Sequence, residues 1–374
     1  MRIIPLVDIS NPAYTNRVPV TKANVGADHQ WNFTQRKMSF EKDLGLKGSY
    51  CFHPFNSITI DKFGDVYMCI CQADLPIPVG KIWDFDSLDA IVQHPIAREL
   101  QASILDGSYR YCNQHNCGIL KAGELNDEIT HRPDTINWIN FAIDSSCNLT
   151  CPSCRRDFIF VNEGPDYDLR ISMVDHIVKL VEQHDHWLKF SISNDGDPFA
   201  SLVYRDLLSK LNIKGMPVEV EIVTNGILAK AYWHKMTGVH QNVVRFKVSM
   251  DAACEETYAI TRRGGSWPKL LESIRYIAEW KRTTGSTMEL MANFVVQQAN
   301  YKEMAQYVEL CEQLGFTEIY FQRIVDWGTF GNQFHKEAVW QESHPEHQEF
   351  LQQLRNPLLK NNSKINLTNL SNLG

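Results

Sequence analysis

The sequence has no excess of positive charge, no long apolar run and no apolar targeting segment at its start. Its formal net charge is −7 over 374 residues, so it lacks the basic face by which nucleic-acid-binding proteins are recognised, although a local basic pocket is compatible with this total. The opening MRIIPLVDIS is too short an apolar run for a signal peptide, and no later segment approaches a membrane span. We therefore expect a cytoplasmic protein that binds neither nucleic acid nor membrane, with one large core and a smaller unit.

Cysteine is what the sequence does have, with ten residues, and in the cytoplasm cysteine favours metal binding over a disulfide framework. Cys147, Cys151 and Cys154 are spaced C-x3-C-x2-C, directly after an apolar stretch, 136–143, that is typical of a strand. Three thiolates on one short loop can bind three irons of a [4Fe–4S] cluster and leave the fourth iron open to a small molecule. Zinc is the alternative, but zinc sites usually add a fourth Cys or His at short spacing, and none follows in this loop.

The run from Ser146 to Cys154 resembles the signature of the radical S-adenosylmethionine (SAM) superfamily. The resemblance implies that the open iron binds the amino and carboxylate groups of SAM. It also implies that reductive cleavage of SAM yields a 5′-deoxyadenosyl radical, which abstracts hydrogen from a substrate. Ser153 departs from the family pattern, in which an aromatic or aliphatic residue that packs on the adenine usually precedes the third cysteine.

Five further cysteines between residues 51 and 117 predict a second metal site. Cys51 and Cys69 flank alternating β-forming residues around a glycine-containing turn, a pattern typical of a hairpin that would bring them together. Cys112 and Cys117 follow a helical stretch over 87–105 and complete a predicted site of four thiolates. Four thiolates suit zinc and a [4Fe–4S] cluster equally well.

The same segment resembles the SPASM and twitch auxiliary-cluster domains of radical SAM enzymes. Cys51, Gly64 and Cys69 match the opening of those domains, and the resemblance implies an auxiliary [4Fe–4S] cluster, suited to accept an electron in a net oxidation. The domain normally follows the barrel, whereas here it precedes it. Cys71 is either a spare ligand or a buried thiol.

Beyond residue 134 the chain alternates strand and helix patterns, which predicts an α/β fold: a partial (β/α)6 TIM-like barrel of the radical SAM type, behind the small cysteine-rich domain. The predicted strands are 136–143, 187–193, 218–224, 243–249, 289–296 and 318–322, and the predicted helices are 172–184, 204–211, 229–236, 267–283 and 301–314. The predicted domains are an extension over 1–45, a SPASM/twitch-like domain over 46–125, the barrel over 126–330 and a C-terminal tail over 331–374.

Polar motifs stand at the ends of the predicted strands, where barrel enzymes place their chemistry. After the second strand, the run from Asn194 to Pro198 resembles the family's Gly-Gly-Glu-Pro segment, which implies that its carbonyls and the Asp197 carboxylate accept hydrogen bonds from the SAM ammonium. Asp195 stands where glycine is usual. The alternative is a polar turn that caps the next helix.

Later strand ends resemble the family as well. Thr224 and Asn225 begin a Thr-Asn-Gly turn, and Ser249 and Asp251 are followed by Arg262, which would bind the SAM carboxylate or ribose. The predicted SAM contacts are Asn194, Asp195, Gly196, Asp197, Thr224, Asn225, Ser249, Asp251, Arg262 and, as a weaker candidate, Asn293.

Three more residues are candidates for substrate chemistry. Cys254, just beyond the fourth strand, would be able to donate a hydrogen atom to a substrate radical, as in radical SAM epimerases, but a lone cysteine is more often a packing residue. Arg323 and Asp326 follow the sixth strand, where substrate would enter.

The sequence therefore predicts a radical SAM enzyme with a small electron donor, such as flavodoxin or ferredoxin, as its partner. The substrate is a ribosomal peptide or a small molecule such as a sugar or aminocyclitol, and the absence of a leader-binding domain favours the small molecule or a separate peptide carrier. The alternatives are a non-catalytic Fe–S or zinc protein with a redox or scaffold role, and a tRNA-modifying radical SAM enzyme, which would need a basic face.

Overall fold

The computed structural model describes residues 46–70, 78–112, 117, 119–120, 125–126, 135–193, 195–360 and 362–373. The predicted extension over 1–45 lies outside the described residues, as do Cys71 and Asn194. The fold divides into two compact units. The first runs as far as Asp144 and adds Glu163–Asn194 and Met216–Val218, and the second consists of Ser145–Asn162, Asp195–Gly215 and Glu219–Gly374.

The first unit contains a sheet with the strand order β5-β4-β1-β2-β3. Its strands are β1 (Ser57–Asp61), β2 (Asp65–Met68), β3 (Gly80–Lys81), β4 (Trp138–Ala142) and β5 (Leu188–Ile192). Strands β1 and β2 form the predicted hairpin, while β4 pairs in parallel with both β1 and β5. The pairing of β1 with β4 joins the cysteine-rich segment to the first predicted barrel strand, so both contribute to one sheet.

The β1–β2 turn follows from its residues. The side chain of Asp61 accepts hydrogen bonds from the amides of Phe63 (2.8 Å) and Asp65 (2.9 Å). Gly64 has φ +76°, and a Cβ there would lie 2.3 Å from the ring of Trp83. Glycine is therefore required both by the backbone conformation and by the close approach of that ring.

The helices in the described part of the first unit are α3 (His53–Asn56), α4 (Leu88–Gln93), α5 (Pro95–Leu105) and α7 (Pro165–Glu182), with a 3-10 turn at Ile82–Asp84. The sequence predicts one helical stretch over 87–105, but the structure has two helices there. The break falls between His94 and Pro95, because proline cannot donate the backbone hydrogen bond that a continuous helix needs and instead starts α5. Ser87 caps α4 by accepting from the amide of Ala90.

The second unit is built on parallel strands in the order β6-β7-β8-β9-β10. Its strands are β6 (Val218–Thr224, entering from the first unit), β7 (Val243–Ser249), β8 (Glu289–Val296), β9 (Glu318–Arg323) and β10 (Ile365–Asn366). Its helices are α8 (Leu202–Lys210), α9 (Ala229–Tyr232), α10 (Glu255–Thr261), α11 (Trp267–Thr284), α12 (Met304–Gln313), α13 (Phe334–Glu337), α14 (His347–Leu354) and α15 (Pro357–Lys360), with 3-10 turns at Trp233–Lys235, His240–Asn242, Tyr301–Glu303, Gly331–Gln333 and Thr368–Leu373.

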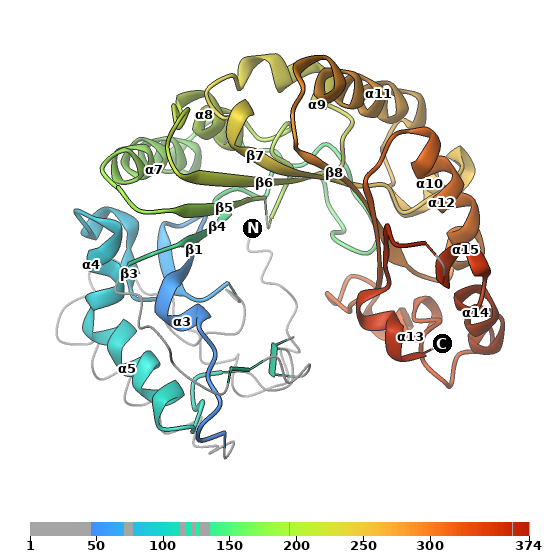
Figure 1. Ribbon diagram of the computed structural model, residues 1–374, viewed down its shortest axis with the longest axis horizontal. Coiled ribbons are helices and arrows are strands. Elements are labelled where there is room, and N and C mark those ends of the chain that lie inside the picture. Colours follow the sequence, from blue (N-terminus) through green and yellow to red (C-terminus); the bar gives the residue numbers. More distant parts are fainter. Residues whose placement is uncertain are drawn as a thin grey trace. The chain divides into compact units, whose positions relative to one another are not determined.

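Within this unit, α9 and α11 lie side by side on one face of strands β6 to β8 (Figure 1). Strand β6 alternates buried and half-buried residues, whereas β8 is almost wholly buried. The strand–helix alternation brings the ends of successive parallel strands to the same edge of the sheet, which is where the polar motifs of the sequence stand.

All six predicted strands are confirmed as β4 to β9, and the α/β fold class with a parallel sheet is confirmed with them. The tail adds α14, α15 and the two-residue strand β10, which pairs in parallel with β9 and was not predicted. In the described part of the chain, no helix is long and apolar enough to cross a membrane.

Candidate cofactor site

The cysteine loop, residues 145–154, follows β4, and its cysteines differ in exposure. Cys147 and Cys151 are buried, whereas Cys154 is exposed. The amide of Cys147 donates to the carbonyl of Ile159 (2.9 Å), and the amide of Cys154 donates to the carbonyl of Cys151 (3.0 Å). The loop is thus held by backbone hydrogen bonds of its own, independently of any metal.

A second clamp on the loop comes from the segment after α10. The amide of Thr150 donates to the carbonyl of Arg263 at 2.9 Å, and the Nε of Arg263 donates back to the carbonyl of Thr150 at 3.1 Å. This reciprocal pair holds the middle of the cysteine loop against the residues that follow Arg262. The position of Arg262 is therefore coupled to that of the loop.

Two arginines lie beside the cysteines: Arg155, which is buried, and Arg262, which is mostly buried. Arg155 donates to the carbonyl of Ser145 at 2.6 Å and interacts electrostatically with Cys154 and Cys147. Arg262 places Nη1 3.9 Å from the sulfur of Cys151. Guanidinium groups remain charged at any ordinary pH, so they offset the negative charge that the thiolates acquire when they bind iron.

Burial makes the thiols of Cys147 and Cys151 harder to deprotonate. Burial raises the pKa of Cys147 to about 12, and burial also raises that of Cys151. A cluster bound by these cysteines would have to displace the protons, which would couple its loading to pH.

Asp197 is the most fully hydrogen-bonded side chain of the site. Its Oδ1 accepts from the amides of Phe199 (3.0 Å) and Ala200 (3.1 Å), and its Oδ2 accepts from the Thr224 hydroxyl (2.7 Å) and the Asn225 amide (2.8 Å). The carboxylate is buried, and burial raises its pKa. Four protein donors thus bind the oxygens of Asp197. Through these hydrogen bonds, Asp197 joins the segment after β5 to the end of β6.

Asn225 carries this connection on to the cysteine loop. Its side-chain nitrogen donates to Oδ1 of Asn148 (2.9 Å) and lies 3.7 Å from the sulfur of Cys147. Thr224 and Asn225, both predicted as SAM contacts, are therefore brought next to the cysteines, and Thr224 binds Asp197.

Asp195 and Gly196 precede this carboxylate. The hydroxyl of Ser145 donates to Asp195 at 2.5 Å, and the guanidinium of Arg155 lies 3.8 Å from the other carboxylate oxygen. The aspartate that replaces the family's glycine thus interacts with two residues that flank the cysteines. Gly196 has φ +78°, which glycine adopts without strain.

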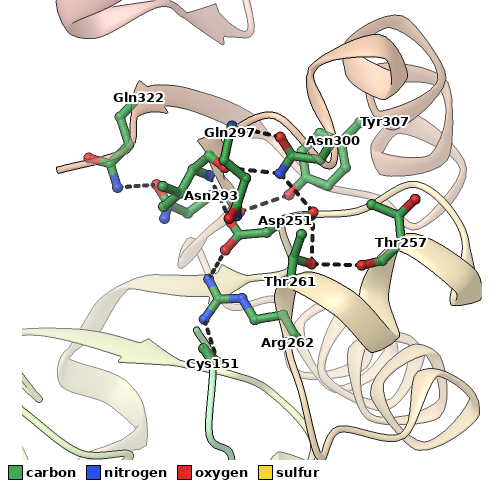
Figure 2. A network of polar contacts seen from close by, with 11 residues as sticks. Cys151, Asp251, Thr257, Thr261, Arg262, Asn293, Gln297, Asn300, Tyr307 and Gln322 are labelled. Carbon is green, nitrogen blue, oxygen red and sulfur yellow. Dashed lines mark hydrogen bonds and ion pairs between the residues drawn. The ribbon is translucent and has the colours of Figure 1, made fainter. Parts of the chain in front are cut away.

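Asp251 and Arg262 form a buried ion pair, with 2.7 Å between carboxylate and guanidinium (Figure 2). The other carboxylate oxygen accepts from the amide of Val295 at 2.7 Å. The carbonyl of Asp251 accepts from Asn300 (3.0 Å) and Thr261 (3.2 Å). These contacts hold Asp251 in a left-handed conformation, φ +55°, and aim Arg262 at Cys151.

The remaining predicted SAM contacts lie on neighbouring strands. Ser249 ends β7 and is paired in register with Asn293 of β8. Asn293 is buried, accepts from the side chain of Gln322 at 3.3 Å, and receives the hydroxyl of Tyr307 on its carbonyl at 3.1 Å (Figure 2). The roles of these two residues toward SAM stay predictions.

The three substrate candidates have different surroundings. Cys254 immediately precedes α10, with its sulfur 3.4 Å from a carboxylate oxygen of Glu303 and 3.6 Å from the hydroxyl of Thr257. Arg323 stacks on the ring of Trp340, 4.6 Å from its centre. Asp326 is exposed and accepts from the amide of Gly328 at 2.6 Å, as a turn residue does. Their substrate roles stay predictions.

In the first unit, two of the four predicted auxiliary ligands, Cys51 and Cys112, contact Tyr109. Its hydroxyl accepts from the amide of Cys51 (3.0 Å), its carbonyl accepts from the amide of Cys112 (2.8 Å), and Cys117 interacts electrostatically with Cys51. Cys69 directly follows β2, where its amide donates to a carbonyl at the start of β1. The four-cysteine site itself stays a prediction.

Several residues that build the site were not found from the sequence. They are Ser145, Asn148, Arg155 and Glu303. Asn148, directly after the first cysteine, and Arg155, directly after the third, had a signal in their place beside the motif, whereas Glu303 is recognised only by partners far away in the chain.

The residues fit the cofactors that this cysteine pattern implies. Among the described residues, no three Cys, His, Asp or Glu side chains converge on a point that suits a single metal ion. A [4Fe–4S] cluster needs no such convergence, since each thiolate binds its own iron. The buried Nε of Arg262 has no hydrogen-bond acceptor in the described part of the protein, and a carboxylate ligand would supply one.

Two family models match the chain. Residues 144–293 match the radical SAM superfamily, and residues 51–118 match SPASM, an iron–sulfur cluster-binding domain. The matched domains imply a SAM-binding [4Fe–4S] cluster and an auxiliary one, as predicted.

Curated relatives include two proteins named probable GTP 3',8-cyclase. The one from Methanocaldococcus jannaschii is 25% identical over 186 residues, covering 48% of this chain and 56% of the relative. The one from Saccharolobus islandicus is 25% identical over 176 residues, covering 46% of this chain and 52% of the relative. The chain thus spans about half the length of the curated relatives it matches.

Similar solved structures include Streptococcus suis SuiB bound to S-adenosylmethionine, which is 11% identical with a TM-score of 0.42 and covers 62% of this chain and 49% of SuiB. They also include TYW1 with a lysine–pyruvate adduct bound, 16% identical with a TM-score of 0.38, covering 58% of this chain and 71% of TYW1. By its two matched domains, the chain is a radical SAM superfamily protein in which a SPASM domain precedes the radical SAM domain.

Proposed function

We propose that this protein is an enzyme that cleaves SAM reductively and uses the product to abstract hydrogen from an organic substrate. The observation that supports it best is a single loop with three cysteines, beside which two arginines, Arg155 and Arg262, supply positive charge. When bound there, a [4Fe–4S] cluster supplies the electron for this cleavage. The chain's own residues hold the loop, balance its charge and orient the ligand.

Arg262 has the central orienting role in this proposal. Asp251 fixes its guanidinium at 2.7 Å, and the backbone clamp between Thr150 and Arg263 keeps it beside the cysteine loop. The unsatisfied Nε of Arg262 supports the predicted contact with the SAM carboxylate. Asp197 supports the site by positioning Asn225. Its predicted contact with the SAM ammonium would have to share an oxygen that already accepts from the protein, and mutagenesis tests this contact.

The auxiliary site is proposed to hold a second [4Fe–4S] cluster, bound by Cys51, Cys69, Cys112 and Cys117, that accepts an electron in a net oxidation. The contacts of Cys51 and Cys112 with Tyr109, and the interaction of Cys117 with Cys51, support this assignment. The proposed substrate is a peptide or a sugar-like small molecule, with flavodoxin or ferredoxin as electron donor.

The first experiment measures SAM cleavage. Protein reconstituted anaerobically and supplied with dithionite and SAM should release 5′-deoxyadenosine, and Cys151→Ala should abolish the release. Cys311→Ala is the matched control, because Cys311 is also a buried free cysteine but lies in the core on α12, so release should persist. Release by Cys151→Ala at the rate of the control would disprove the proposal.

The second experiment isolates the auxiliary site. A variant that lacks Cys147, Cys151 and Cys154 should still bind about four irons, as a four-thiolate cluster does. Removing Cys51 from that variant should eliminate the iron. Zinc in place of iron would assign the auxiliary site a structural role and contradict the proposed electron transfer.

A further inference from the structure

Tyr258 is a buried tyrosine on α10 whose hydroxyl has no hydrogen-bond partner in the described part of the protein. Its side chain is among the largest that are completely enclosed, with 1% of its surface exposed. Burying a hydroxyl without a partner is unfavourable, and native proteins rarely leave one in this state without a reason. The phenol therefore needs an explanation that core packing does not give.

The phenol lies among the polar groups of the cofactor site. Tyr258 precedes Arg262 by four residues, and the amide of Arg262 donates to the carbonyl of Tyr258 at 2.8 Å, so both side chains start from the same face of the helix end. The groups that interact electrostatically with the phenol are Arg262, Cys151, Asp251 and Asp197.

Gly265, which has no side chain, leaves space for the hydroxyl of Tyr258. A Cβ at Gly265 would lie 2.8 Å from the hydroxyl oxygen and 2.6 Å from a ring carbon of Tyr258. The ring also packs against Trp267, with 5.2 Å between the ring centres. The ring thus contacts both Gly265 and Trp267, and these contacts limit its orientation.

The neighbouring acceptors are already engaged. The four hydrogen bonds to Asp197 occupy its carboxylate, and Asp251 is shared between the amide of Val295 and the guanidinium of Arg262. Burial and the nearby negative groups keep the pKa of Tyr258 above its ordinary value, so the phenol is a neutral donor at physiological pH. An acceptor for this donor has to arrive with a ligand.

We propose that Tyr258 is a SAM-binding residue whose hydroxyl donates a hydrogen bond to the SAM carboxylate, beside Arg262. This inference rests on the proposed function, since it takes SAM as the ligand of the site. A carboxylate is the acceptor that fits a neutral donor and a guanidinium on one helix face, because it has two oxygens and can accept from both.

Tyr258→Phe removes the hydroxyl alone and tests the proposal. In reconstituted protein, the affinity for SAM, measured by equilibrium binding, should fall about tenfold to a hundredfold, the range for a hydrogen bond to a charged group. The cofactor-free variant should melt at the same temperature as the unmodified protein or higher, because an unsatisfied buried group has been removed. Iron content should not change.

Tyr301→Phe is the control. The hydroxyl of Tyr301, also on a fully buried residue, donates to Glu349 at 2.9 Å, so its removal should lower the melting temperature and leave SAM affinity unchanged. Unchanged SAM affinity in Tyr258→Phe, when the unmodified protein binds SAM, would overturn the inference but not the proposed function. A shifted reduction potential of the cluster in Tyr258→Phe without SAM would also overturn it, by assigning the phenol to a cysteine sulfur. Failure of the unmodified protein to bind SAM would overturn both.

Discussion

Replacing Asp251 by Asn tests whether the buried ion pair at the end of β7 organises the site. The substitution preserves the size of the side chain, and the amide oxygen can still accept from the amide of Val295. It removes only the charge that faces Arg262, 2.7 Å away. Because the guanidinium is largely buried, with 13% of the side chain exposed, water can replace that charge only in part.

The size of the effect follows from the geometry. Two unit charges about 4 Å apart at an effective dielectric constant of about 20 attract by about 4 kcal/mol. Removing one partner of a buried pair typically costs about 3–5 kcal/mol, since the other charge stays buried and unpaired. We therefore expect Asp251→Asn to lower the free energy of unfolding by about 3 kcal/mol, and Arg262→Met to lower it by a comparable or smaller amount.

The double variant provides the decisive comparison. Asp251→Asn combined with Arg262→Met leaves no unpaired charge, so it should be more stable than the sum of the single effects predicts by about 2 kcal/mol or more. Urea unfolding of the cofactor-free proteins is the suitable measurement, because urea, unlike guanidinium chloride, adds no salt that screens the pair. Additivity within about 0.5 kcal/mol would show that the two residues do not stabilise each other and would refute this reasoning.

Three further predictions concern single residues. Asp197→Ala removes the acceptor of four hydrogen bonds. By the proposed contact between this carboxylate and SAM, the variant should bind SAM about tenfold to a hundredfold more weakly. Loss of iron in an iron assay would show instead that Asp197 acts only by holding the cysteine loop. Burial and the carboxylate of Asp65 raise the pKa of Asp61 to about 7. The contribution of Asp61 to the free energy of unfolding is therefore complete below pH about 4 and is lost as the pH rises through 7. Urea unfolding should show this loss, at most about 4 kcal/mol, and Asp61→Asn should abolish it. Gly64→Ala should lower the melting temperature, because the added Cβ would lie 2.3 Å from the ring of Trp83 and the residue would keep φ +76°; an unchanged melting temperature would contradict the turn geometry.

The strands were predictable from the sequence because each has a local signal. Strand β6 matches its predicted range at both ends, since alternating apolar residues begin and end with it. The pairing of β1 with β4 was not predictable, because no local pattern tells which strand of another segment a buried strand will join. Strand β10 has two residues, too few for any periodicity.

The candidate site was predictable only where chemistry depends on spacing. The spacing of three cysteines in one loop predicts a cluster site by itself, whereas two of the four partners of Asp197, Thr224 and Asn225, lie 27 and 28 residues further along the chain. The sequence indicated that an acidic residue stands at the end of a strand. The sequence did not indicate that this carboxylate accepts hydrogen bonds from Thr224 and Asn225 at the end of the next strand. The buried phenol of Tyr258 gave no sign either, since a tyrosine on a helix is an ordinary core residue.

Because the three loop cysteines differ in exposure, they react in a definite order with oxidants and alkylating agents from solution. Cys154 is exposed while Cys147 and Cys151 are buried, and the pKa values of the two buried thiols are raised. Oxidants and alkylating agents act on accessible thiolates, so before the cluster is loaded they reach Cys154 first. A short exposure to air would therefore oxidise Cys154, one of the three proposed cluster ligands, before the two buried cysteines.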